Sequence, residues 1–163
     1  CSSGEEPYSL AIMVHRTLGV RLTDWHVEIL GTDISQKVLN QAIEGRYSSF
    51  SFRSVSPMII KRYFKEEKGT FEIDPEIKSM VNFEQLNLKD TLKAKRHGQW
   101  DIIFCRNVMI YFDDDMKQRC VQMFHDQLAP DGTLFIGHSE SIRNTGVPFA
   151  QIDAPQAFAY KKA

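Results

Sequence analysis

One stretch, Trp100–Phe112 (WDIIFCRNVMIYF), constrains the fold of this chain more than any other. It begins with an apolar run of strand length that ends at Cys105, and a polar pair follows at once. Open α/β sheets bind their ligands just outside the carboxyl ends of the strands. The pattern therefore predicts a buried strand, with Arg106 and Asn107 at the floor of a ligand cleft and Tyr111 at its mouth.

Size, charge and cysteine use indicate a globular protein of the reducing cytoplasm. The 163 residues suffice for one domain with a full core, and no apolar run approaches the roughly 20 residues that span a bilayer. A net charge of −1 offers no basic field for nucleic acid or a membrane surface. The three cysteines form no C-x-x-C pair and the five histidines show no ligand-like spacing, so neither disulfides nor a metal are expected.

The chain opens with a small-residue turn at Cys1–Gly4. A helix is predicted over about Glu5–Leu18 with Ser3 as its N-cap, then a strand over Val27–Thr32 and a second helix that ends at Gly45. This order is the middle of a nucleotide-binding βαβ unit, in which a strand precedes the turn. We therefore expect the chain to be a segment of a longer protein. The apolar face of the first helix is expected to consist of Leu10, Met13, Val14 and Leu18.

Residues from about 46 to 83 interrupt this alternation. A short helix after Pro57 and short strands at Thr70–Ile73 and Val81–Leu86 predict an inserted antiparallel β-subdomain. The basic stretch Lys89–Gly98 that follows is expected to be helical in part.

The last third returns to the α/β order. After the strand that ends at Cys105, a helix should begin at Asp113 or Asp114, and the turn APDG should lead into a strand over Thr133–Gly137. A final strand, Ala157–Lys161, is expected to pair antiparallel with it. The expected fold is one α/β domain, residues 1–163, with a mostly parallel sheet and an antiparallel last strand.

The first candidate site lies in the opening turn and the strand after it. Glu5 and Glu6 stand where a pyrophosphate would need free backbone N–H groups. The turn therefore favours a nucleoside-like ligand with a positively charged tail, as in S-adenosylmethionine. Asp33, about 27 residues after Glu6, can accept two hydrogen bonds from a ribose diol. The alternatives are a plain helix cap at the turn and an ordinary aspartate before the cap residue Ser35.

The second candidate site follows the central strand. The amide of Asn107 both donates and accepts hydrogen bonds, and Arg106 can neutralise a carboxylate. An ion pair that merely fixes the loop is the alternative. Tyr111, taken by itself, fits a core aromatic better than a catalytic one. Cys105 fits an inert buried thiol better than a reactive thiolate.

Residues 137–141, GHSES, come near the nucleophile elbow G-x-S-x-G of serine hydrolases. Ser141 replaces the last glycine and no helix is predicted after it, so hydrolase chemistry is not expected. We expect His138 and Glu140 to shape a loop at the edge of the sheet instead.

Several motifs together resemble one known family. CSSGEEPYSLAI, GTDIS, LNL, WDIIFCRNVMIYF and LAPDGTLFIGHSES follow one another as in the CheR family of chemotaxis receptor methyltransferases, from Cys1 to about Ser141. Members use S-adenosylmethionine, leave S-adenosylhomocysteine, and esterify glutamate side chains on the cytoplasmic helices of chemoreceptors. The resemblance implies a Rossmann-like methyltransferase fold.

Carried over by position, the resemblance implies a role for seven residues. Asp33 would hold the ribose, and Asn87 and Leu88 would line the adenine side. Tyr111 and Arg106 would be the catalytic residues, near the methyl group and the incoming glutamate. The implied cofactor-binding residues are Glu6, Asp33, Asn87, Leu88, Arg106 and Asn107.

The resemblance also implies partners. Chemoreceptor helices would be the substrate of a monomeric enzyme. The family's N-terminal helical domain and first strand do not occur in this sequence. The turn Lys65–Thr70 is short and lacks a glycine-rich extension, which speaks against the tethering of a receptor peptide. The alternatives are a non-catalytic domain that binds the cofactor or a partner, and a methyltransferase with another acceptor.

Overall fold

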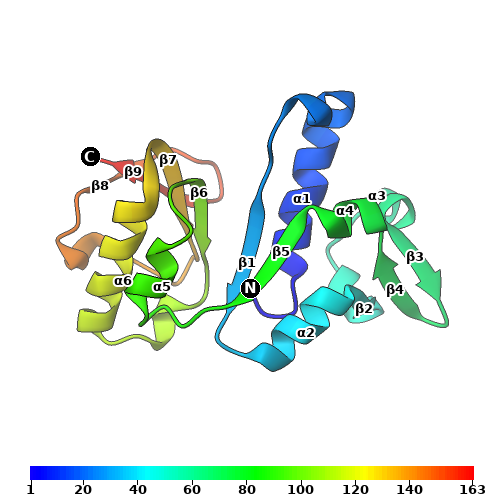
Figure 1. Ribbon diagram of the computed structural model, residues 1–163, viewed down its shortest axis with the longest axis horizontal. Coiled ribbons are helices and arrows are strands. Elements are labelled where there is room, and N and C mark those ends of the chain that lie inside the picture. The colour runs from blue at the N-terminus through cyan, green and yellow to red at the C-terminus, as the bar shows by residue number, and fades with distance from the viewer. The chain divides into compact units, whose positions relative to one another are not determined.

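The computed structural model describes all residues from 1 to 163. The chain forms two compact units, residues 1–87 and 88–163 (Figure 1). Both units contain helices and strands, and short strands between Arg46 and Ile73 interrupt the α/β alternation, as the sequence predicts. None of the helices is both long and apolar enough to cross a membrane.

The first unit is organised around a parallel pair of strands. Its helical elements are α1 (Glu5–Leu18), η1 (Gly19–Asp24), α2 (Gln36–Glu44), η2 (Ser49–Phe52), α3 (Pro57–Tyr63) and α4 (Pro75–Ser79). Its strands are β1 (Ile29–Asp33), β2 (Arg46–Ser48), β3 (Phe64–Glu67), β4 (Thr70–Ile73) and β5 (Val81–Gln85). Strands β1 and β5 pair in parallel, with Asp33 opposite Gln85 (Figure 1). Their carboxyl ends therefore lie side by side.

Helix α1 has the predicted bounds but a different cap and a different buried face. Gly4 is the N-cap, and the hydroxyl of Ser3 donates to the Glu5 carboxylate at 2.7 Å, so the predicted cap at Ser3 is wrong. Met13 is 60% exposed, so the predicted apolar face is wrong as well. The buried face consists of Pro7, Tyr8, Ala11 and Ile12.

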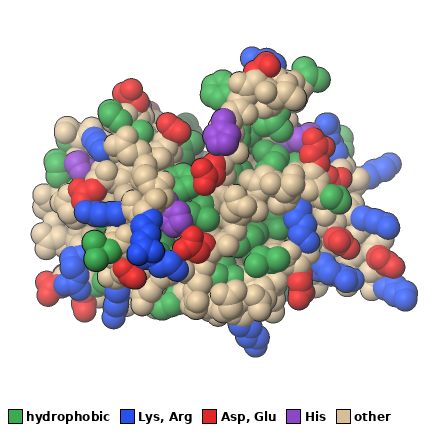
Figure 2. All heavy atoms as spheres, viewed as in Figure 1, with side chains coloured by type: hydrophobic (Ala, Val, Ile, Leu, Met, Phe, Trp, Pro, Cys, Tyr) green, Lys and Arg blue, Asp and Glu red, His purple; other side chains and the backbone are tan.

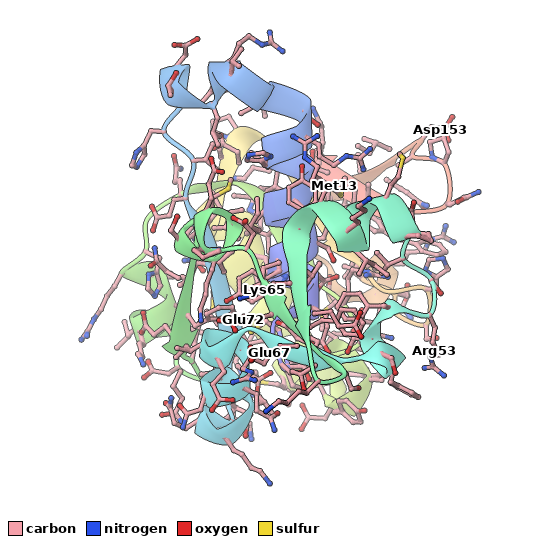
Figure 3. The ribbon with its side chains drawn as sticks, turned by 90° about the vertical axis from the view of Figure 1, so that its right-hand side faces the viewer. Met13, Arg53, Lys65, Glu67, Glu72 and Asp153 are labelled. Atoms are coloured by element: carbon pink, nitrogen blue, oxygen red, sulfur yellow. The ribbon has the colours of Figure 1, made fainter.

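The segment between the parallel strands forms a small antiparallel sheet in the order β2-β4-β3. Lys65 on β3 lies opposite Glu72 on β4, which is a cross-strand pair of opposite charge (Figure 3). The sheet packs onto α1, since one hydrophobic cluster unites residues from both. Its buried members are Tyr8, Ala11, Ile12, Tyr47, Tyr63, Ile73, Ile77 and Val81.

The second unit is a four-stranded sheet with two helices. Its elements are α5 (Thr91–Lys95), β6 (Trp100–Cys105), η3 (Met109–Tyr111), α6 (Asp114–Gln127), β7 (Leu128–Ile136), η4 (Arg143–Thr145), β8 (Phe149–Ile152) and β9 (Phe158–Lys162). The strand order is β6-β7-β9-β8, with β6 and β7 parallel. The predicted antiparallel pairing of the last strand with β7 is confirmed.

Two further predictions for this unit can be compared with the structure. The turn sequence APDG lies within β7, where the register with β6 shifts between Trp100 opposite Leu128 and Ile102 opposite Thr133. The residues of the turn are thus accommodated as an irregularity of the strand. The basic stretch before β6 contains the short helix α5, and Lys and Arg side chains gather over α5 and α6 (Figure 2).

Candidate cofactor site

The carboxyl edge of the parallel pair in the first unit brings two predicted site residues together. Asp33 ends β1, and its carbonyl oxygen accepts a 2.9 Å hydrogen bond from the backbone N–H of Leu86, just beyond β5. Asn87 is the next residue along the chain and is exposed. Asp33 and Asn87 therefore lie at the same edge of the sheet, which is where open α/β sheets bind ligands.

The side chain of Asp33 ties three segments together at this edge. Its Oδ2 accepts a 2.9 Å hydrogen bond from the backbone N–H of Ser2, and its Oδ1 accepts one of 2.9 Å from the backbone N–H of Ser35. Burial alone raises the pKa of Asp33, but the hydrogen bonds from Ser35 and Ser2 lower it, and the pKa lies below its usual value. The carboxylate is thus kept charged, and a charged acceptor makes the stronger hydrogen bonds to hydroxyl groups.

The opening turn approaches α2 closely because position 4 is glycine. Gly4 has a φ of 90°, and a Cβ there would lie 2.8 Å from the Cβ of Ala42 on α2. The hydroxyl of Tyr47 donates a 2.9 Å hydrogen bond to the carbonyl oxygen of Ser3 and holds the turn from the other side. The turn is therefore a fixed backbone surface beside Asp33.

The first turn of α1 is acidic. Glu5 accepts hydrogen bonds from Ser3 at 2.7 Å and from Ser51 at 3.3 Å, whereas Glu6 is half-buried. Carboxylates at this end of a helix complement its dipole and repel phosphate. Together with the acceptor Asp33 and the amide of Asn87, they suit a nucleoside-like ligand that carries a positive charge, so these residues fit S-adenosylmethionine.

The second unit places Arg106, Asn107 and Tyr111 on one short segment after β6. Arg106 and Asn107 are exposed, and Asn107 has a φ of 59°, in the left-handed region that asparagine tolerates better than most residues. Tyr111 lies in η3 and is 82% exposed. The reading of Tyr111 as a core aromatic is therefore wrong, and its ring is available at the surface of this unit. Leu88, the first residue of the unit, is half-buried.

The carboxylate of Glu140 organises this segment. Its Oε2 accepts hydrogen bonds from the backbone N–H groups of Asn107 at 2.9 Å and Gly137 at 2.7 Å. Its Oε1 accepts from the backbone N–H groups of Val108 at 2.9 Å and Met109 at 2.8 Å. The prediction that Glu140 shapes a loop is confirmed. The sequence did not reveal that the shaped loop is the one that carries Arg106 and Asn107.

Two alternative chemistries do not fit this unit. Cys105 is buried, and a hydrogen bond with Cys120, together with burial, raises the pKa of its thiol, so a reactive thiolate is not formed there. Only the three-residue η4 follows the GHSES sequence, so the strand–turn–helix of a nucleophile elbow is absent.

The structure contains no cluster of three or more His, Cys, Asp or Glu residues that could hold a metal ion.

Comparison with known proteins identifies relatives over nearly the whole chain. A profile described as "CheR methyltransferase, SAM binding domain" matches residues 1–158. The chain is 37% identical over 143 residues to chemotaxis protein methyltransferase 2 of Vibrio cholerae, which covers 87% of this chain and 49% of the relative. It is 40% identical over 147 residues to the chemotaxis protein methyltransferase of Escherichia coli. This alignment covers 86% of this chain and 49% of the relative. The chain thus spans about half the length of these relatives.

Solved structures show the fold. A TehB-like SAM-dependent methyltransferase from Corynebacterium glutamicum aligns over 100% of this chain and 77% of its own, with a TM-score of 0.54 and 13% identity. The rRNA methyltransferase aviRa from Streptomyces viridochromogenes aligns over 98% of this chain and 72% of its own, with a TM-score of 0.55 and 9% identity. The predicted Rossmann-like methyltransferase fold is therefore confirmed.

Proposed function

Because this chain belongs to the CheR family of S-adenosylmethionine-binding methyltransferase domains, we propose that it methylates glutamate side chains of chemoreceptors. The single observation that carries the proposal is the family match over residues 1–158. The cofactor of this domain is S-adenosylmethionine. The acceptor is inferred from the resemblance and from the names of the relatives, which place methylation in chemotaxis.

The resemblance assigns cofactor roles to residues of each unit. In the first unit, Asp33 accepts hydrogen bonds from the ribose and Asn87 lies on the adenine side, which is supported by their position at one sheet edge. Glu6, in the acidic first turn of α1, supplies negative charge for the cationic part of the cofactor.

In the second unit, Leu88 provides an apolar surface for the adenine. Arg106 and Asn107 meet the methionine end, where a guanidinium can bind the cofactor's carboxylate and an amide can both donate and accept. Their exposure directly after Cys105, the buried last residue of β6, supports this assignment.

Methylation of a carboxylate requires few catalytic groups from the protein. A glutamate side chain is already ionised at neutral pH, so this nucleophile needs no general base. When bound, S-adenosylmethionine supplies a methyl group on a sulfonium, which leaves as a neutral thioether. The protein's task is then to align the acceptor and exclude water. Tyr111 provides a hydroxyl and an aromatic face beside the acceptor. Arg106 either orients the carboxylate of the acceptor or binds that of the cofactor.

Methyl transfer from radiolabelled S-adenosylmethionine to chemoreceptor membranes tests the proposal. We expect labelled receptor from which mild base releases the label as methanol, because carboxyl methyl esters hydrolyse readily. Label that resists mild base would contradict a glutamate acceptor. Binding of S-adenosylhomocysteine without any transfer to receptor would indicate a non-catalytic domain instead.

A further inference from the structure

We propose that Glu140 is a positioning residue for the cofactor, which it serves by holding the backbone of residues 106–109 in its binding shape. The inference rests on the proposed cofactor roles of Arg106 and Asn107. Glu140 itself is 8% exposed and lies in the turn that follows β7. It therefore acts through the loop rather than by touching the cofactor.

The four hydrogen bonds of Glu140 use the whole capacity of a carboxylate. Each of its two oxygens accepts two backbone N–H groups, at distances between 2.7 and 2.9 Å. An ionised carboxylate accepts about four hydrogen bonds and donates none. Three of the donors are the consecutive residues Asn107, Val108 and Met109, so one side chain fixes three successive peptide units.

The loop needs such a partner because it leaves the sheet abruptly. Strand β6 ends at Cys105, and η3 begins only at Met109. Between them, Asn107 adopts the left-handed conformation, which disfavours L-residues in general and which asparagine tolerates better than most. Backbone N–H groups left without partners in a half-buried loop would destabilise it further. Glu140 satisfies these groups and so sets the direction in which the loop continues after Asn107.

The turn before Glu140 is adapted to this contact. The backbone N–H of Glu140 donates to the carbonyl oxygen of Gly137 at 3.1 Å, which closes the turn. A Cβ at position 137 would lie 2.7 Å from Oε2 of Glu140 and 3.1 Å from the backbone nitrogen of Asn107. Only glycine at position 137 therefore lets the carboxylate reach both its own turn and the loop after β6.

This arrangement distinguishes glutamate from glutamine at position 140. The glutamine amide has one acceptor oxygen and one NH2 group, which only donates. Whichever way the amide is oriented, two of the four backbone N–H groups face another donor. E140Q preserves the size of the side chain and removes two of the four hydrogen bonds that Glu140 accepts.

The experiment compares the affinity of the purified protein for S-adenosylhomocysteine, by isothermal titration calorimetry, among single and double variants. We expect E140Q to weaken binding about tenfold or more, since a tenfold change corresponds to about 1.4 kcal/mol. N107A should weaken binding too, because it removes the side-chain amide. N107A/E140Q should bind no worse than the weaker-binding single variant, because E140Q acts through the placement of that same amide. D131N removes one negative charge at an exposed position of the same unit and should bind like wild type.

The outcomes separate this inference from the proposed function. If R106A and N107A both bind like wild type, the cofactor roles of that loop are wrong. If they weaken binding while E140Q matches D131N, the positioning role of Glu140 is overturned. E140D keeps the charge and shortens the side chain by one methylene. It replaces E140Q in the binding experiment if E140Q does not fold. It should bind more weakly than wild type, and wild-type affinity in a folded E140D would equally contradict the proposal.

Discussion

The backbone N–H of Ser2 donates a 2.9 Å hydrogen bond to the carboxylate of Asp33, which lies 31 residues further along the chain. The residue proposed to bind the ribose therefore also holds the opening turn against the end of β1. A substitution at Asp33 changes both the acceptor and the shape of the turn, so the two effects need separate variants.

We expect D33A to lower the affinity for S-adenosylhomocysteine by more than about tenfold, because it removes the ribose acceptor and releases the turn. D33N keeps one oxygen, which can accept from either Ser2 or Ser35, and should fall between wild type and D33A. Calorimetric titration provides the affinities, and thermal unfolding reports the stability of the turn. Unchanged affinity in D33A would rule out the ribose assignment.

We expect Y111F to slow methyl transfer while it leaves cofactor affinity and stability nearly unchanged. Tyr111 is 82% exposed, and substitutions at exposed positions usually change the free energy of unfolding by less than about 0.5 kcal/mol. Single-turnover transfer and calorimetry with S-adenosylhomocysteine measure the two effects. If Y111F transfers the methyl group at the wild-type rate, the hydroxyl of Tyr111 has no catalytic role.

We expect G4A to destabilise the protein by about 1–3 kcal/mol more than G19A does, because overpacking is added to backbone strain. Both glycines have positive φ, at 90° and 53°, so both substitutions carry strain. A Cβ on Gly4 meets Ala42 at 2.8 Å, whereas nothing lies within 4 Å of one on Gly19. Urea unfolding measures the difference, and equal losses would refute the close approach of the turn to α2.

We expect the stability of the protein to fall as pH rises above about 10, the usual pKa of tyrosine. Burial raises the pKa of Tyr8 to about 12, and its hydroxyl donates a 2.9 Å hydrogen bond to the carbonyl oxygen of Ala42. Burial, with Tyr8 and Glu5 nearby, raises the pKa of Tyr47 as well. The folded state thus keeps its phenol protons between about pH 10 and 12, whereas the unfolded chain loses them and is favoured.

The variant Y8F checks the origin of this alkaline loss. Its free energy of unfolding, measured in urea between pH 8 and 11, should depend less steeply on pH than that of wild type. Y111F, at an exposed position, is the matched control. A Y8F protein as alkali-sensitive as wild type would show that the buried phenol of Tyr8 is not responsible.

Local signals in the sequence predicted most of the elements well. The bounds of α1, of β6 and of β4 agree with the prediction, because helix caps, apolar runs and turn residues act over a few neighbouring positions. The buried face of α1 was predicted incorrectly. Leu10 and Met13 are as apolar as Tyr8 and Ile12, and the choice between the two faces depends on where the inserted sheet packs.

The sequence also predicted part of the candidate site, namely single residues but not their contacts. Strand-end positions identified Asp33, Arg106 and Asn107 as candidates before any fold was known. The contacts of Asp33 with Ser2 and of Glu140 with the Asn107 loop have no local signature, since each joins residues more than 30 positions apart. Glutamates are common in any sequence, and burial is what singles out Glu140.

The order of most helices and strands, the polar pair after β6 and the family motifs were determined by the sequence alone. Periodicity, turn chemistry and motif order are properties of neighbouring residues, so they can be read without coordinates. The tertiary structure alone decided which face of α1 is buried, that Tyr111 is exposed, and that Glu140 holds the loop after β6. These features depend on packing and hydrogen bonding between segments that are distant in the chain, and such contacts exist only once the chain has folded.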